Sequence, residues 1–263
     1  MCYHRGMDIN LIALNLGNSR LAIGVFHAGE LVHTQRLGMD QQSEWVPAIR
    51  QAWAKIAPLP NASVTGASVN PPLEAAIEKV VHEVCDRQVQ WAGRQIDLPI
   101  DVLTEPPQQT GVDRVLNVAA AFEQLQKACI VVDAGTAITL NCCNEAGDFV
   151  GGAIAPGIGL MLDALHEKTA GLPKIAFEVP TEVFGRSTAE AMRRGVYDAI
   201  RGLVKEFAEG YATRLGEWPE IIATGGDAQK LFADWELIHA ISPDLTLYGV
   251  ALAYTEHHIK HGT

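Results

Sequence analysis

Two short segments contain the residue types that bind phosphate groups and a small polar substrate. The first is DAGTAIT, residues 133 to 139, in which Asp133 ends the apolar stretch CIVV and is followed by a glycine and two threonines. A carboxylate oxygen is a hard ligand for a cation, whereas hydroxyls and glycine amides suit phosphate oxygens. The alternative is a plain β-turn in which Asp133 caps its own backbone.

The second segment is GVDR, residues 111 to 114, which joins a carboxylate to a guanidinium at the start of an expected helix. Free amides and the helix dipole favour anions there. Arg114 can hold a substrate carboxylate, and Asp113 can accept a hydroxyl proton. Because an ordinary Asp, with a pKa of about 3.9, is a weak base, its role in phosphoryl transfer would mostly be orientation. The alternative is a helix-start Asp beside a solvated Arg.

The elements expected to position these segments begin in the same way in each half of the chain. When Leu11 is aligned with Cys129, Asn15 falls on Asp133 and Gly17 on Gly135. Both stretches alternate an apolar run, a glycine turn and a second apolar run, as in IALNLGNSRLAIGVF. We therefore expect two duplicated mixed α/β halves with a ligand cleft between them.

Other segments complete the expected halves. Strands are predicted at residues 63–69 and 220–226, and a helix begins near GVDR. Ser187 and Glu190 predict a capping box, which opens a further helix. The stretches GGAIAPGIG and ATGGDA are either plain turns or places where a base or ribose packs on backbone. The C-terminal HHIKH is predicted to be a solvated tail, with adventitious metal binding as the alternative, and Cys142 and Cys143 are predicted to be packing residues.

Composition limits the class of protein. The 263 residues allow one large domain or two lobes, and 48% hydrophobic with 19% charged residues is typical of a soluble globular chain. A net charge of −11 argues against a nucleic-acid partner. The apolar stretch at residues 149–162 is too short for a membrane span. Five cysteines without a CxxC pair predict a reducing cytoplasm.

From Asn10 to Tyr254 the chain resembles the type III pantothenate kinase family, which includes the Bvg accessory factor proteins. The resemblance rests, in chain order, on NLGNSRLAIG, GVDR, DAGTAIT, GGAIAPG, GRSTAEAMRRG, ATGGDA and PDLTLYGVALAY. It implies an α/β fold with two ribonuclease H-like lobes of the acetate and sugar kinase, Hsp70 and actin-like type. We place the first phosphate loop and the substrate segment in residues 8–126. The second phosphate loop and the nucleotide-base segment fall in residues 127–257.

The resemblance also implies an activity and its requirements. Members transfer a phosphoryl group from ATP to the primary hydroxyl of pantothenate, which gives 4′-phosphopantothenate in the first step of coenzyme A biosynthesis. The implied cofactors are magnesium with ATP and a monovalent cation, potassium or ammonium. The implied assembly is a cytoplasmic homodimer.

Residue roles are carried over by the same resemblance. Asp113 resembles the proton acceptor, Asp133 the monovalent-cation ligand, and Thr188 a threonine that reaches pantothenate from the partner subunit. The expected ATP-binding residues are Asn15, Leu16, Gly17, Asn18, Ser19, Arg20, Leu21, Ala22 and Thr136. The expected substrate-binding residues are Thr104, Gly111, Val112, Asp113, Arg114 and Thr188.

Two positions depart from the family pattern. Asn15 stands where the family has Asp, so it keeps a carbonyl oxygen but lacks the charge that attracts magnesium. Thr104 stands where the family has Tyr, so the expected substrate pocket lacks an aromatic wall. Together they motivate an alternative, a catalytically impaired binding or regulatory protein. A third hypothesis, an actin-like or sugar-kinase ATPase with another substrate, is disfavoured because such chains usually carry inserted subdomains.

Overall fold

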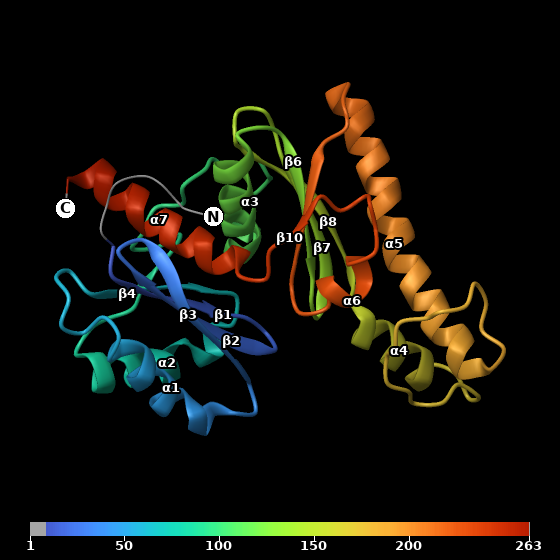
Figure 1. Cartoon of the computed structure of the whole chain (residues 1–263), viewed down its shortest axis with the longest axis horizontal. Helices are drawn as coiled ribbons and strands as arrows, with labels where there is room; N and C mark the ends of the chain where they lie inside the picture. The colour runs from blue at the N-terminus through green and yellow to red at the C-terminus, as the bar shows by residue number, and fades with distance from the viewer. Residues whose placement is uncertain (1–8, 263) are drawn as a thin grey trace. The chain divides into compact units, whose positions relative to one another are not determined.

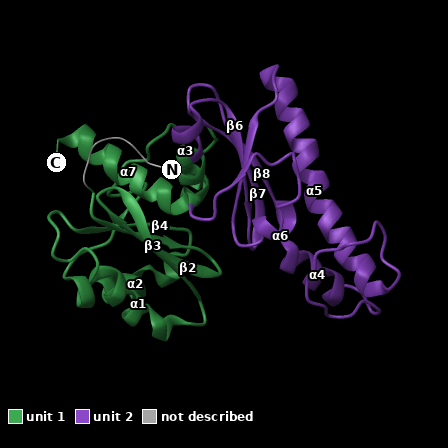
Figure 2. Ribbon diagram, in the orientation of Figure 1, with its two compact units in different colours: residues 1–120, 245–263 green, residues 121–244 purple. Residues whose placement is uncertain are grey.

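The computed structural model describes residues 9–262, and the chain divides into two compact units (Figures 1 and 2). Unit 1 consists of residues 1–120 and 245–263, and unit 2 of residues 121–244. The end of the chain therefore belongs to unit 1, whereas the predicted lobes, 8–126 and 127–257, are contiguous. The reason is the C-terminal helix α7 (Leu245–His261), whose apolar residues pack against strand β1 (Leu11–Leu16).

The remaining elements follow in chain order. Those before the second sheet are β2 (Arg20–His27), β3 (Glu30–Gly38), the 3-10 turn η1 (Gln42–Glu44), α1 (Trp45–Trp53), β4 (Ser63–Ser68), α2 (Pro71–Cys85), β5 (Gln90–Trp91), η2 (Pro107–Gln109) and α3 (Val112–Leu125). Those that follow are β6 (Cys129–Ala134), β7 (Ala137–Cys143), β8 (Phe149–Pro156), α4 (Ile158–Glu167), α5 (Thr188–Leu215), β9 (Glu220–Thr224), α6 (Ala228–Phe232) and β10 (Ala240–Ile241).

The two units contain sheets with the same topology. In unit 1 the strand order is β3-β2-β1-β4-β5, and in unit 2 it is β8-β7-β6-β9-β10. The central strand of each sheet pairs antiparallel with the next strand in sequence, β1 with β2 and β6 with β7. On its other side it pairs parallel with the strand that follows a crossover, β4 or β9. This shared topology confirms the prediction of two mixed α/β halves with equivalent hairpins.

Alternation along the central strands decides which side chains reach the core. In β1 the even-numbered residues Ile12, Leu14 and Leu16 lie in a cluster with α1 and α2, while Leu11 and Ala13 lie in the cluster that contains α7. Because successive strand residues point to opposite faces, Asn15 belongs to the α7 face of its sheet.

The same alternation applies in unit 2. Ile130, Val132 and Ala134 of β6 pack with residues of α4, α5 and α6, so Asp133 lies on the opposite face of that sheet. Asn15 and Asp133 are thus equivalent: each is the fifth residue of its central strand.

Several local predictions are confirmed. The capping box of α5 is present, with Glu190 N donating to Ser187 Oγ at 3.3 Å and Ser187 N donating to Glu190 Oε2 at 3.2 Å. The four described cysteines are buried and free of disulfides, in agreement with a packing role for Cys142 and Cys143. Cys2 lies outside the described residues. Among the residues described, no helix has the length and apolar character required to cross a bilayer.

The predicted solvated tail at residues 257–261 is a helical segment, in which only residues 259–261 are exposed. HHIKH forms the last turns of α7, because the apolar residues earlier in that helix anchor it on the unit 1 sheet. His257 and His258 are partly buried as a result.

Candidate functional site

Three glycine-containing segments meet at the β6–β7 turn of unit 2. The turn itself is closed by Gly135 N, which donates to Ala137 O at 3.0 Å. Gly157, at the start of α4, donates its N–H to Thr136 O at 3.0 Å, and Asp227, before α6, donates to Ala134 O at 2.9 Å. These hydrogen bonds hold the predicted second phosphate loop between two other backbone segments.

The glycines in this cluster are required by close approach. A Cβ added to Gly157 would lie 2.2 Å from Gly135 O, and one added to Gly225 would lie 2.5 Å from Asp133 Oδ1. Gly225 also has a φ of +93°, which L side chains rarely adopt. The stretches GGAIAPGIG and ATGGDA therefore serve at Gly157 and Gly225 to pack against the turn that carries Asp133. Sequence reasoning missed this role, since glycine content alone does not name the neighbour.

The two threonines of DAGTAIT have different surroundings. Thr139 Oγ1 accepts a hydrogen bond from Asn141 Nδ2 at 2.9 Å, within the sheet. Thr136 is exposed at the turn. Thr136 is therefore the more accessible of the two threonines, whereas Thr139 is bonded within the sheet.

The equivalent loop in unit 1 is the β1–β2 turn. Gly17 N donates to Arg20 O at 3.1 Å and closes the turn, while Asn70 Nδ2 donates to Gly17 O at 3.1 Å and holds it from β4's side. Asn18, Ser19 and Arg20 are exposed. Leu16, Leu21 and Ala22 are buried in the core, so their side chains are not available to a ligand.

Asn15 contains a buried polar atom of particular interest. Its Oδ1 is buried and has no hydrogen-bond partner among the described residues. Leaving such an acceptor unsatisfied costs about 1–3 kcal/mol, so a group that binds there recovers that energy. An amide oxygen at this position and a carboxylate at Asp133 are both hard donors, and their chemistry fits the magnesium and monovalent cation that the family resemblance implies.

The GVDR segment occupies the start of α3, as predicted. Asp113 Oδ1 accepts a hydrogen bond from the backbone N–H of Arg114 at 2.8 Å. Burial raises the pKa of Asp113, against the opposing effects of that hydrogen bond and of the Arg114 charge. Burial also lowers the pKa of Arg114, which the Asp113 charge opposes. Gly111 is close enough that an added Cβ would lie 2.8 Å from Asp113 Oδ1.

Thr104 lies in the loop before α3 and is paired with a residue that sequence reasoning missed. Its Oγ1 lies 2.6 Å from Thr110 Oγ1, directly before the GVDR segment. The spacing of two threonines gave no signal of this contact. The pair links the position that departs from the family pattern to the substrate segment.

Thr188 is the first residue of α5 and is exposed. It lines a hollow of about 760 Å³ in unit 2, formed mostly by apolar residues of α4 and α5 such as Leu160, Met161 and Val196. The predicted residues are thus distributed over both units: Asn15–Ala22, Thr104 and Gly111–Arg114 lie in unit 1, and Asp133, Thr136 and Thr188 lie in unit 2.

Comparison with known proteins identifies the family. The model of the type III pantothenate kinase family matches residues 11–210. The chain belongs to this family. A type III pantothenate kinase of Dehalococcoides mccartyi is 35% identical over 254 residues, which cover 94% of this chain and 98% of the relative. Those of Solibacter usitatus and Brevibacillus brevis are each 32% identical, with 94% and 93% of this chain and 97% and 98% of the relatives covered.

Solved structures show the fold. A Baf family protein from Campylobacter jejuni aligns with a TM-score of 0.59 at 21% identity, covering 93% of this chain and 98% of the other. The activator of 2-hydroxyisocaproyl-CoA dehydratase from Clostridium difficile aligns with a TM-score of 0.50 at 12% identity, covering 97% of each chain. The chain thus has the α/β fold of two equivalent units that the resemblance implies.

Proposed function

We propose that this protein catalyses ATP-dependent phosphorylation of the primary hydroxyl of pantothenate, which yields 4′-phosphopantothenate and ADP. Membership of the type III pantothenate kinase family supports the reaction. The observation that carries the residue assignment is the partly buried Asp113, whose pKa burial raises, beside Arg114 at the start of α3.

In this proposal Asp113 binds the substrate hydroxyl and accepts its proton as the phosphoryl group is transferred. Burial raises the pKa of Asp113, so its carboxylate takes up a proton more readily than that of an exposed Asp. Arg114 binds the carboxylate of pantothenate, for which the guanidinium offers paired donors. Thr104 and Thr110, whose Oγ1 atoms lie 2.6 Å apart, precede this segment and supply further hydroxyls.

The phosphates of ATP are assigned to the two equivalent turns. The exposed Asn18–Arg20 stretch and the backbone of Asn15–Ala22 form the first loop, and Thr136 contacts ATP from the second. Magnesium bound with ATP would neutralise phosphate charge, and Asp133 would hold the monovalent cation, which would add to that neutralisation. Asn15 Oδ1, which is buried without a partner among the described residues, provides a neutral oxygen toward the magnesium or its water.

We further propose that the enzyme acts as a cytoplasmic homodimer in which Thr188 reaches the pantothenate of the other subunit. Thr188 lines the apolar hollow between α4 and α5. In the segment before it, Val183 is 81% exposed and Phe184 is 66% exposed. Apolar side chains exposed together are typical of an association surface. The four described cysteines, buried and without disulfides, agree with a reducing compartment.

The test is a coupled ADP-release assay with ATP, magnesium, potassium and pantothenate. We expect pantothenate-dependent ADP release, its loss in Asp113→Asn, and its retention in Asp86→Asn. Asp86 is a matched control because it is exposed and in the left-handed conformation that Asn accepts. A native protein without pantothenate-dependent turnover would contradict the kinase and favour the binding or regulatory alternative.

A further inference from the structure

Three side chains with metal-binding atoms meet on the surface of unit 1, apart from the residues assigned to catalysis. Asp97 follows β5, and His257 and His261 lie in the last turns of α7. Asp97 Oδ2 lies 3.2 Å from His261 Nε2 and 3.6 Å from His257 Nδ1. One ligand atom from each residue lies within 4.8 Å of those of the other two.

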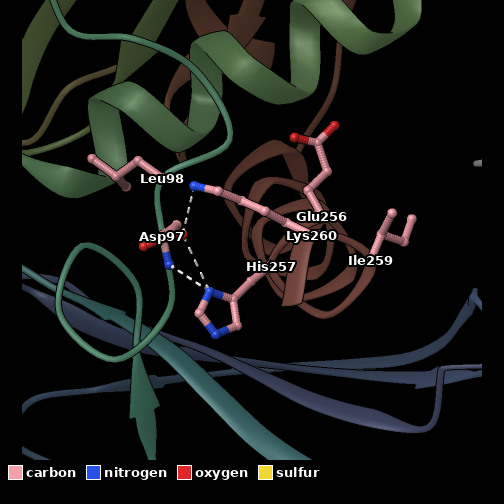
Figure 3. Close-up of a pocket in the computed structure, with 6 residues that line it drawn as sticks. All are labelled: Asp97, Leu98, Glu256, His257, Ile259 and Lys260. Atoms are coloured by element: carbon pink, nitrogen blue, oxygen red, sulfur yellow. Dashed lines mark hydrogen bonds and ion pairs between the residues drawn. The ribbon is translucent and has the colours of Figure 1, made fainter. Parts of the chain in front are cut away.

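Helix geometry explains the arrangement of the two histidines. Residues four apart lie on the same face of a helix, and the rings of His257 and His261 have centroids 4.4 Å apart. That face of α7 is directed toward the loop that contains Asp97, as Figure 3 shows for His257. Two imidazoles at this spacing, together with a carboxylate from another segment, can chelate one ion.

The loop that contains Asp97 holds the ring of His257 in place. Its Nδ1 accepts a hydrogen bond from the backbone N–H of Asp97 at 3.2 Å, and a metal ion at Nδ1 would replace that hydrogen bond. The Asp97 carboxylate lies on the same side of the ring, with Oδ2 3.6 Å from Nδ1. A cation between these two atoms would be coordinated by both residues.

We propose that Asp97, His257 and His261 bind a divalent first-row transition-metal ion, with Zn²⁺ as the representative. Imidazole nitrogens with one carboxylate are the donors that such ions take, and three protein ligands leave a position for water. A hollow of about 270 Å³ lies beside this set and is lined by Asp97, His257 and Lys260 among others (Figure 3). The ion joins the end of α7 to the segment after β5.

Lys260 competes with the metal for the same carboxylate. Its Nζ lies 3.0 Å from Asp97 Oδ2, and the side chain is 68% exposed, so it can move into solvent when a metal binds. Because of this competition, removal of the Lys260 charge should strengthen metal binding. Histidines that bound metal without Asp97 would show no such effect.

The experiment is a titration of untagged full-length protein with Zn²⁺ alone, followed by calorimetry and by competition with a chromophoric chelator. We expect one saturable site per chain in the native protein. Asp97→Asn and His261→Gln should each weaken binding at least tenfold, and Lys260→Gln should strengthen it. Zn²⁺ should also raise the melting temperature of the native protein and not of Asp97→Asn.

His258→Gln is the matched control. His258 lies in the same helical turn, but its Nδ1 is 2.8 Å from Tyr254 O and its ring packs on that of Tyr254, with centroids 4.0 Å apart. Its substitution should leave Zn²⁺ affinity unchanged. Circular dichroism verifies that each variant is folded.

Three results would overturn the proposal: the absence of a saturable site, equal weakening by His258→Gln and His261→Gln, or unchanged binding after Asp97→Asn. The outcome is independent of the pantothenate kinase assay, because none of these residues is assigned to substrate or ATP.

Discussion

Replacement of Gly157 by Ala tests whether the glycine-rich segment before α4 positions the DAGT turn. The φ of Gly157 is −77°, so Ala introduces no backbone strain, and its effect comes from contact alone. The new Cβ would lie 2.2 Å from Gly135 O and 2.6 Å from Thr136 O. Because non-bonded atoms need more than 3 Å, the two backbone segments must separate by about 1 Å.

Both stability and activity should respond to this separation. Steric overpacking of this severity costs about 3 kcal/mol, near the upper end of the usual range. For a chain of this size that cost lowers the melting temperature by about 6–12 °C. If this turn contacts ATP as we propose, a shift of about 1 Å lowers kcat/KM by about 100-fold. Scanning calorimetry and the coupled ADP-release assay measure the two effects.

Gly159→Ala is the matched control, two residues along the chain. A Cβ at Gly159 meets nothing within 4 Å, and the residue lies in the first turn of α4. Ala there should stabilise the protein by about 0.5–1 kcal/mol through helix propensity, with kcat/KM unchanged. If Gly157→Ala retained the melting temperature and kcat/KM of Gly159→Ala, the assignment of Gly157 as a support of the turn would be refuted.

Three further substitutions test individual oxygens. Burial raises the folded-state pKa of Asp113, so stability is lost as pH rises from its unfolded pKa through its folded pKa. Asp113→Asn should therefore raise the melting temperature at pH 7 while lowering kcat by about 10²–10⁴-fold, and the acid-side fall in native kcat/KM should track Asp113 ionisation. Asn15→Asp should lower the magnesium concentration for half-maximal activity, since a carboxylate replaces a neutral oxygen; an unchanged magnesium curve would place Asn15 outside the metal's reach. Asp133→Asn should weaken activation by potassium in a salt titration at constant ionic strength, and an unaltered titration would assign the cation elsewhere.

Local chemistry made much of the fold predictable from sequence. The hairpin at Asn15 and its equivalent at Asp133 follow from apolar alternation broken by a glycine turn, which needs no distant partner. The α5 start follows from Ser187 and Glu190, because a capping box is complete within four residues. The position of Asp113 at the start of α3 was predictable for the same reason. The order of these motifs along the chain indicated the family.

Contacts between segments far apart in the chain were not predictable in the same way. The sequence by itself determined the two repeated halves, the hairpins, the helix caps and the residue types of the site, since these depend on spacing within one element. Only the tertiary structure decided that Gly157 and Gly225 support the Asp133 turn, that α7 belongs to the first unit, and that His257 and His261 meet Asp97. Each of these depends on which buried face an element packs against, and that choice is made by the folded core as a whole.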